Sequence, residues 1–476
     1  MRKVSILKRH RSRAPFHKVK KRKKPVLRGR HMHRLRGVAQ AGTCLLSRRP
    51  SAGKKKTREN NGLRVYDYLF LMSTSATLPI RPRADVNVKP LGVALLFIVL
   101  GALYLAQVVD ARQSALYLVG ALLGVALYHA AFGFTSAWRV FIADGRGAGL
   151  RAQMIMLAVG VLLFFPALSS GTLFGTPVTG LVSPAGTSVV VGAFIFGIGM
   201  QLGGGCASGT LYTVGGGSTR MIVTLIAFIA GSVIATAHMP YWTSLPQLEP
   251  ISLVKTLGLA PALLLNLAVF ALIAGITVVV EKRRHGRLVS PDAKPVAGPR
   301  WLRGPWPLVA GALALVVLNF ATLALAGRPW GVTSAFALWG AKAASSIGID
   351  VASWTYWSTK ANAAALAAPI SQDVTSVMDI GIVLGAMLAA ALAGRYAPVW
   401  KLPLRSFIAA VVGGLLLGYG ARLAYGCNIG AYFSGIISGS LHGWLWLVFA
   451  FAGNVIGTRL RPLFGLEVER VKLAAC

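Results

Sequence analysis

The sequence predicts an all-α polytopic membrane protein with nine or ten transmembrane helices, arranged as two inverted repeats with broken helices at a central pore. Of its 476 residues, 55% are hydrophobic and only 13% are charged, which is about half the charged fraction (about 25%) of a soluble domain. Ten apolar stretches approach the length of about 20 residues that a helix needs to cross a bilayer. Two glycine-rich segments, each with one cysteine, also match each other in the two halves of the chain.

Residues 1–71 form a basic segment that holds 23 of the 50 Lys and Arg residues. Such a composition buries too little apolar surface to fold, so we expect disorder. The segment contains no apolar core of the length of a signal peptide. A misassigned start is one interpretation, because Met72 opens a sequence typical of a short cytosolic lead-in (72–90). A basic arm that binds anionic lipid is the alternative, and we expect no nucleic-acid partner.

The apolar stretches define the expected spans. Two of them are rich in glycine, which leaves the count at nine or ten. The stretches are 91–109, 114–134, 152–170, 186–205, 218–238, 258–280, 306–326, 375–394, 406–424 and 441–458.

Basic residues in short loops indicate the orientation, because such loops stay on the cytoplasmic side. The linker 281–305 is strongly basic, so we place it in the cytoplasm. Counting spans from this linker puts the basic loops 139–151 and 395–405 on the same side, together with both termini and the tail 461–476. The long connection 327–374 then lies outside, and we expect it to contain membrane-embedded helical pieces. We therefore expect a multi-pass protein of the bacterial inner membrane.

An internal repeat is visible in two pairs of motifs. The segment GIGMQLGGGCASGTLYTVGGGSTR from Gly197 matches GYGARLAYGCNIGAYFSGIISGSLHG from Gly418. Upstream in each half, FGFTSAW at 132–138 resembles WGVTSAF at 330–336. We divide the chain into a first repeat with extra flanking helices (91–280) and a second repeat (306–460). An odd number of spans separates them, so the second repeat is inverted, as in many transporters with a site near the membrane midplane.

The matched motifs contain the candidate site. Glycine clusters interrupt a helix, and the new helix N-termini suit an anionic ligand. Close helix packing is the alternative explanation of the glycines, but each cluster here encloses a cysteine. Thiols are soft, weak hydrogen-bond donors that suit a ligand presenting sulfur. The candidate pathway residues are Cys206, Gly205 and Gly209 in the first repeat, and Cys427, Gly426, Gly430 and Asn428 in the second.

Charged residues near the spans are also candidates. Arg422 lies five residues before the second cysteine, and Arg220 and His442 are repeat equivalents near opposite mouths. These groups can attract an anion, and interfacial snorkelling is the alternative. Asp379 needs a partner, for which Lys342 and Arg422 are the candidates, and we favour a structural ion pair over a proton site.

These residues resemble the YeeE/YedE sulfur-transport membrane proteins. The resemblance rests on GGGCASGTLYTVGGGS (203–218), YGCNIGAYFSGI (425–436), the paired G-x-T-S-A segments and the number of spans, and it covers about 90–460. It implies uptake of a sulfur-containing ion through a narrow path on which Cys206 and Cys427 contact the substrate by S–H hydrogen bonds. Thiosulfate transporters of this type use a third membrane cysteine, which is missing from these spans, so a selenium or another sulfur species stays open.

We therefore predict a transporter for uptake of a small, thiosulfate-like sulfur anion. One alternative is a membrane sulfurtransferase in which a cysteine carries a persulfide, and a second is a membrane partner that recruits a soluble sulfur-carrier protein through the 281–303 loop. The sequence contains no Walker motif, metal-ligand cluster or nucleophile–base pair. We accordingly expect no enzyme activity, no cofactor and no metal.

Overall fold

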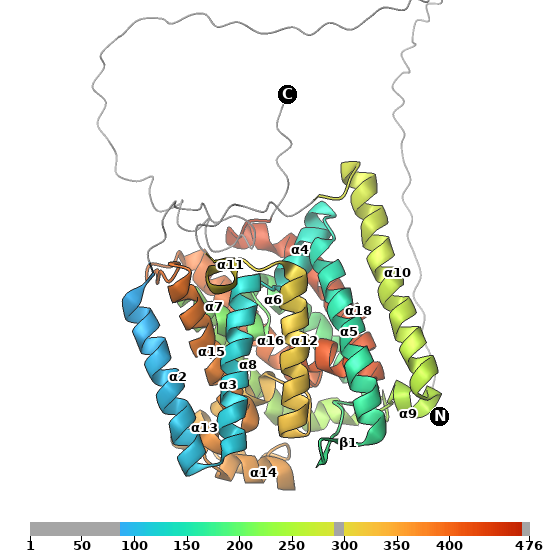
Figure 1. Ribbon diagram of the computed structural model, residues 1–476. Helices are drawn as coiled ribbons and strands as arrows, with labels where there is room; N and C mark the ends of the chain where they lie inside the picture. The colour runs from blue at the N-terminus through green and yellow to red at the C-terminus, as the bar shows by residue number, and fades with distance from the viewer. Residues whose placement is uncertain (1–85, 290–298, 469–476) are drawn as a thin grey trace, which may run out of the picture. The chain divides into compact units, whose positions relative to one another are not determined.

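The computed structural model describes residues 86–289 and 299–468. In this part of the chain, ten helical segments are long and apolar enough to cross a membrane (Figure 1). This confirms the predicted class of all-α polytopic membrane protein. The predicted basic segment 1–71 lies outside the described residues, as do most of the lead-in, the middle of the 281–305 linker and the end of the tail.

The first half of the chain contains six predicted spans, and a helix covers each of them. Its G-x-T-S-A and glycine–cysteine motifs fall at breaks between consecutive helices. The helices are α2 (Val88–Val108), α3 (Ala111–Ala130), α4 (Phe134–Asp144), α5 (Ala148–Ser170), α6 (Thr187–Gly203), α7 (Ala207–Gly215), α8 (Thr219–Ser244), α9 (Leu253–Leu257) and α10 (Leu259–His285). Two short antiparallel strand pairs join the loops, β1 (Thr172–Leu173) with β2 (Thr176–Pro177), and β3 (Ala185–Gly186) with β4 (Gln247–Leu248).

The second half repeats this order. The long connection after α12 contains helical pieces, as predicted. The elements are α11 (Arg300–Arg303), α12 (Leu308–Ala326), α13 (Thr333–Ser346), η1 (Val351–Ser353), α14 (Lys360–Ala367), η2 (Ile370–Gln372), α15 (Val374–Leu392), α16 (Leu404–Leu423), the π-helix η3 (Asn428–Ser434), α17 (Gly435–Ile437), α18 (Leu441–Leu460) and η4 (Arg461–Phe464).

Matched helices of the two halves run in opposite directions. The end of α3 lies next to the start of α12. The Trp306 N–H, just before α12, donates to the carbonyl oxygen of His129, near the end of α3, at 2.8 Å. In the same way, Gly192 near the start of α6 lies against Leu423 at the end of α16, whereas Gly203 at the end of α6 lies against Gly413 in the middle of α16. Antiparallel directions of equivalent helices are the arrangement that an inverted repeat requires.

The two halves interlock rather than lie side by side. Helix α3 packs on α15, and its counterpart α12 packs on α5. Helix α6 packs on α18, and α16 packs on α8. Helix α7 contacts α15, and α17 contacts α5. The outer helix α10 packs on α5 as α2 packs on α15, so we propose that α10 is the counterpart of α2 and that the spans divide into five and five.

Small residues allow the central helices to approach closely. A Cβ atom added to Gly124 of α3 or to Gly385 of α15 would overlap the backbone of the other helix. Close backbone approach at glycine is a usual way to associate helices in a membrane, where lipid is as apolar as leucine. The seam therefore fixes the position of α15 against α3.

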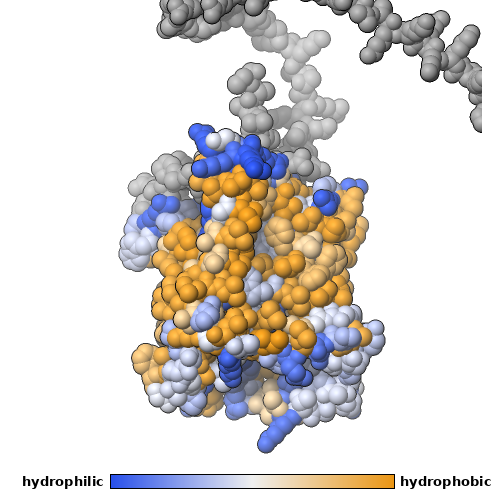
Figure 2. All heavy atoms as spheres, turned by 90° about the vertical axis from the view of Figure 1, so that its right-hand side faces the viewer, coloured by the Kyte–Doolittle hydropathy of each residue, from blue (hydrophilic) through white to orange (hydrophobic). Residues whose placement is uncertain are grey.

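The outside of the bundle is apolar over its middle part (Figure 2). On α10, the side chains of Leu264 and Leu272 are 66% and 62% exposed. In water such a surface promotes association, whereas in a bilayer it contacts lipid tails. Hydrophilic residues gather at both ends of the molecule in this view, as expected where the chain leaves the hydrocarbon core.

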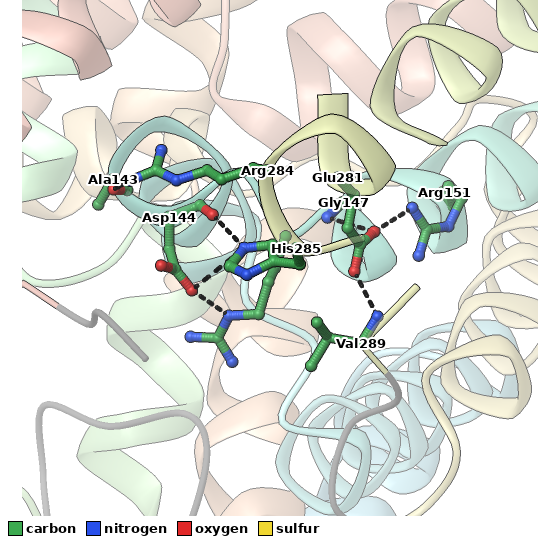
Figure 3. A network of polar contacts seen from close by, with 9 residues as sticks. Ala143, Asp144, Gly147, Arg151, Glu281, Arg284, His285 and Val289 are labelled. Carbon is green, nitrogen blue, oxygen red and sulfur yellow. Dashed lines mark hydrogen bonds and ion pairs between the residues drawn. The ribbon is translucent and has the colours of Figure 1, made fainter. Parts of the chain in front are cut away.

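Helix α10 runs five residues further than the predicted span, to His285. The reason is the buried carboxylate of Glu281, which accepts hydrogen bonds from Arg151 Nη1 at 2.6 Å and from the N–H groups of Gly147 at 3.1 Å and Val289 at 3.0 Å (Figure 3). The start of the linker is therefore tied to the α4–α5 turn. The same network contains Ala143, Asp144, Arg146, Arg284 and His285.

Candidate functional site

Two short helices begin at the centre of the bundle, one in each half. Helix α7 starts directly after Cys206, and the helical segment η3–α17 starts directly after Cys427. Each is preceded by a break with a left-handed glycine, Gly204 at φ 97° and Gly426 at φ 153°. A side chain is strained at such φ values. The two glycine–cysteine motifs therefore produce the broken helices that the sequence predicts.

The two cysteines occupy equivalent positions, as N-caps of these short helices. Cys206 Sγ accepts the Gly209 N–H at 3.4 Å, and Cys427 Sγ accepts the Ile429 N–H at 3.4 Å. Both side chains are buried, and the two short helices that they cap, α7 and η3, contact each other. Two helix N-termini, each with a partial positive charge, thus meet beside two sulfur atoms.

Asn428, the residue after Cys427, has hydrogen-bonding groups that no described protein group uses. The Asn428 side chain is fully buried, and neither its oxygen nor its nitrogen has a hydrogen-bond partner in the part of the chain that the structure describes. A Cβ atom added to Gly430 would meet no atom within 4 Å. Buried amides without partners are rare in native structures and call for an explanation, such as a ligand or an ordered water. The unpaired amide and the open space at Gly430 are therefore two separate features of the start of η3 that a small polar ligand can use.

Gly205 and Gly209 line the first cysteine more tightly. A Cβ atom on Gly209 would lie 3.4 Å from Cys206 Sγ, in ordinary contact. On Gly205 it would lie 3.1 Å from the terminal methyl of Met221. The structure therefore brings together seven of the ten predicted pathway residues, namely Cys206, Gly205, Gly209, Cys427, Gly426, Asn428 and Gly430.

An aromatic cluster holds the second short helix in place. The Tyr432 ring of η3 stacks on Trp446 of α18 at 6.3 Å between centroids and meets Trp138 of α4 edge-on at 5.8 Å. Phe134, in the first G-x-T-S-A segment, also packs edge-on against Tyr432 at 6.0 Å. Tyr432 lies inside the second glycine–cysteine motif but was not among the predicted site residues. An aromatic residue at a glycine-rich helix start is the sequence signal that could have identified it.

The second G-x-T-S-A segment contacts the same short helix. Ser434 Oγ of η3 donates to the Trp330 carbonyl oxygen at 2.7 Å and lies 3.1 Å from the Asn319 side-chain nitrogen. Helices α4 and α13 both begin at these segments, after breaks that follow α3 and α12. Both paired motifs therefore support η3, which explains why they recur together.

Arg220 is used to cap a helix. Its guanidinium donates to the carbonyl oxygens of Leu202 and Gly203 at 2.6 and 2.7 Å and to Ser406 Oγ at 2.9 Å. These carbonyls are at the end of α6 and lack partners within the helix. These contacts hold the guanidinium at the end of α6, and the attraction of the anion by Arg220 stays a prediction.

Arg422 and His442 lie towards the opposite end of the bundle, away from the cysteines. Arg422 Nη1 donates to the Tyr356 hydroxyl at 2.8 Å, while Nε has no partner within the described chain. His442 is buried, with Nδ1 2.6 Å from Ser440 Oγ. Its Nε2 likewise has no described partner. Their unused nitrogens keep both residues as candidates for anion contacts.

The predicted ion pair of Asp379 is absent among the described residues. Lys342 Nζ instead donates to the carbonyl oxygens of Leu366 and Ala368, at 2.6 and 2.8 Å, and Arg422 bonds to Tyr356. The expectation was wrong because backbone carbonyls and a tyrosine, which the sequence pattern does not identify as partners, engage both cations.

Two surface pockets, of about 590 and 460 Å³, lie away from the cysteines. The larger is lined by Lys342, Trp357 and residues of α14, and the smaller by His238 and Trp242 of α8 with Tyr419 of α16. Neither contains a residue of the predicted site. Within the described chain, no three His, Cys, Asp or Glu side chains gather as a metal site.

Comparison with known proteins agrees with this architecture. Residues 129–456 match the family model described as sulphur transport. The chain is 28% identical to the thiosulfate transporter TsuA of Spirochaeta thermophila over 71% of its own length and 95% of that protein, and 27% identical to TsuA of Escherichia coli over 70% and 90%. It is 29% identical to the probable transporter YedE of E. coli, over 37% of its own length and 43% of that protein. The chain is a multi-pass membrane protein that belongs to the sulphur-transport family.

Proposed function

We propose that the protein is a transporter of the bacterial plasma membrane that takes up a small sulfur-containing anion, with thiosulfate as the first candidate. The observation that carries this proposal is the convergence of two cysteine-capped helix N-termini on one buried, partly unoccupied site. The family match and the two full-length relatives named thiosulfate transporter support the substrate class.

The site suits an anion that presents both oxygen and sulfur. Helix N-termini favour negative charge through their dipole and their unpaired N–H groups. The Asn428 amide offers two donors to an oxygen. In both cysteines the sulfur accepts a backbone N–H, which leaves the S–H of Cys427 to donate to a soft acceptor, while Cys206 Sγ also lies 3.4 Å from Ser208 Oγ. Thiosulfate has one terminal sulfur and three oxygens, and it matches this combination.

The basic loops place the 281–305 linker in the cytoplasm, and we propose that the anion moves towards that side. The anion then reaches Cys427 before Cys206. Arg422 and His442 lie on the outer side in this orientation, where their unused nitrogens attract the anion. The described spans contain two cysteines, and we propose that they suffice for passage.

The test is uptake of sulfur-labelled thiosulfate into proteoliposomes that contain the full chain. Cys206→Ala and Cys427→Ala are compared with the wild type, and we expect each to lower the initial rate at least about tenfold, which corresponds to about 1.4 kcal/mol of lost interaction. The matched control replaces the two terminal cysteines, Cys44 and Cys476, by alanine and is expected to transport normally.

Each alternative gives a different result. Full uptake by both membrane-cysteine variants would remove the cysteines from the path while leaving the transporter intact. No uptake by a folded wild-type sample would reject thiosulfate as the substrate. A persulfide found on Cys206 or Cys427 during turnover would instead favour the membrane sulfurtransferase. Uptake that appears only when a soluble sulfur carrier is added would favour the recruitment model.

A further inference from the structure

One ionisable group near the cysteines remains without a role in this mechanism. Asp379 lies early in α15, its side chain is fully buried, and neither carboxyl oxygen has a hydrogen-bond partner in the described chain. An ionised carboxylate without a partner is strongly disfavoured in a membrane interior. The side chain therefore carries its proton in this conformation.

The position of Asp379 connects it to the site. Val383 and Ala386 follow it at intervals of four and seven residues, and so share its face of α15. Both pack against Gly215 of α7, the short helix that Cys206 caps. Helix α7 in turn contacts η3, which Cys427 caps. The carboxyl group thus faces the short helices.

Basic side chains near this end of α15 are engaged elsewhere. Arg328 Nη2 lies 3.3 Å from Thr375 Oγ1, and Lys342 is bonded to two backbone carbonyls. No salt bridge to Asp379 occurs in the described chain, and a structural ion pair therefore does not explain its presence. Unpaired ionisable groups within membrane segments commonly mark proton or substrate pathways.

Other groups that titrate or carry charge surround α15. Histidine is the residue among them that ordinarily changes charge near neutral pH, but His129 lies at the far end of α3, against Trp306. The set on the elements packed against α15, and on α15 and its ends, comprises Lys89, Tyr104, Arg112, Tyr117, Tyr128, His129, Cys206, Tyr212, Arg300, Arg303, Lys342, Asp373, Arg395 and, from the second break, Cys427.

The charge on Asp379 bears directly on anion binding. An ionised carboxylate on the face of α15 that packs on α7 repels an anion that passes the short helices, and in a medium of low dielectric constant this repulsion is strong. A protonated carboxyl group exerts no such repulsion and donates one hydrogen bond. The anion therefore binds the protonated form more tightly. By reciprocity, the bound anion must also tighten the binding of the proton.

We propose that Asp379 is the proton-carrying group of the transport cycle, so that anion and proton bind together and are moved together. The proton adds to the carboxylate from the side where the anion enters and leaves to water on the side where the anion is released, so that no other bond is made or broken. This inference rests on the proposed function, and it adds that the proton gradient drives the uptake.

The experiment uses full-length protein in proteoliposomes with the membrane potential clamped at zero. Two quantities are measured, the accumulation of labelled thiosulfate under an imposed pH gradient and the internal pH after thiosulfate is added without a gradient. For each coupled proton, one pH unit of inward gradient raises the accumulation ratio about tenfold. We expect the wild type to show this dependence and to acidify the interior when thiosulfate enters.

The variant Asp379→Asn retains the size of the side chain but binds no proton. We expect it to exchange labelled for unlabelled thiosulfate across the membrane but to show neither the gradient dependence nor the acidification. The matched control is Asp373→Asn in the same helix. Asp373 accepts the Ser376 N–H at 2.8 Å as an N-cap, and asparagine caps equally well. This control is expected to behave as the wild type.

Three results would overturn the inference. The first is wild-type uptake that neither follows the pH gradient nor acidifies the interior, which leaves the proposed function intact. The second is an Asp379→Asn variant that still moves protons with thiosulfate. The third is a wild type that transports no thiosulfate, which rejects the proposed function itself and the inference with it. A wild type that does not acidify the interior overturns the inference even if the variant does not fold.

Discussion

The substitution Gly430→Ala is expected to leave the stability of the protein unchanged or higher while it slows transport. A Cβ atom at this position meets no atom within 4 Å, and the glycine is not among the described residues with positive φ. The backbone therefore accepts alanine without strain. Because glycine is less favourable than alanine inside a helix by about 1 kcal/mol, Gly430→Ala is expected to leave the unfolding free energy unchanged or raise it by up to this amount.

Transport is expected to respond in the opposite direction. The new methyl group occupies the open space at Gly430, through which we propose that the anion passes. An extra methyl in a filled site typically costs about 1–3 kcal/mol, and each 1.4 kcal/mol is a factor of ten in affinity. We therefore expect the rate of thiosulfate uptake at low concentration to fall by about tenfold to a hundredfold.

The assay pairs thermal unfolding in detergent with uptake into proteoliposomes. The matched control is Gly275→Ala on α10, because a Cβ atom there also meets no atom within 4 Å and the position faces outward, away from the site. This control is expected to match Gly430→Ala in stability and the wild type in uptake. Undiminished uptake by a stable Gly430→Ala variant would refute the idea that the anion passes through this space.

Two further predictions concern the framework around the site. Glu281→Ala leaves Arg151 and two backbone N–H groups without their carboxylate. We expect the unfolding free energy to fall by about 3–5 kcal/mol and the Tm in detergent to fall with it. A Tm no lower than that of Arg283→Ala, the control at an exposed charge, would contradict this. Gly385→Ala pushes α15 away from the Ala121 carbonyl oxygen, so we expect a loss of about 1–3 kcal/mol together with slower uptake. An unshifted Tm for Gly385→Ala would show that the α3–α15 seam adjusts freely.

The spans and the breaks were predictable because the bilayer constrains them directly. Hydrocarbon requires about 20 apolar residues per helix, and each predicted stretch is covered by one described helix. The glycine–cysteine motifs were predictable for a related reason, since irregular backbone inside a membrane is tolerated only where protein or water satisfies it. The sequence pattern therefore identified Gly204 and Gly426 as part of two broken segments before their left-handed conformation was known.

Partners of polar side chains were not predictable in this way. Arg220 was expected near a mouth as an anion attractor, and its bonds to the carbonyl oxygens at the end of α6 were not expected. Lys342 was a candidate partner of Asp379, and it instead donates to two carbonyl oxygens. Both outcomes depend on where a helix end or a loop brings backbone carbonyls, and hydropathy and charge patterns contain no information on such positions.

The weakness of the individual contacts is what makes the site suitable for passage. A path conducts only if binding is favourable enough to admit the anion and weak enough to release it. Thiols are weak donors, and the sulfur atoms of Cys206 and Cys427 already accept one N–H each at the long distance of 3.4 Å. Fixed cations at the centre would hold an anion far more tightly, and here the Arg220 guanidinium is bonded to the carbonyl oxygens at the end of α6 and that of Arg422 to the Tyr356 hydroxyl. Helix N-termini and a protonated Asp379 then compensate the charge of the anion without trapping it, which links the choice of cysteine to the requirement for release.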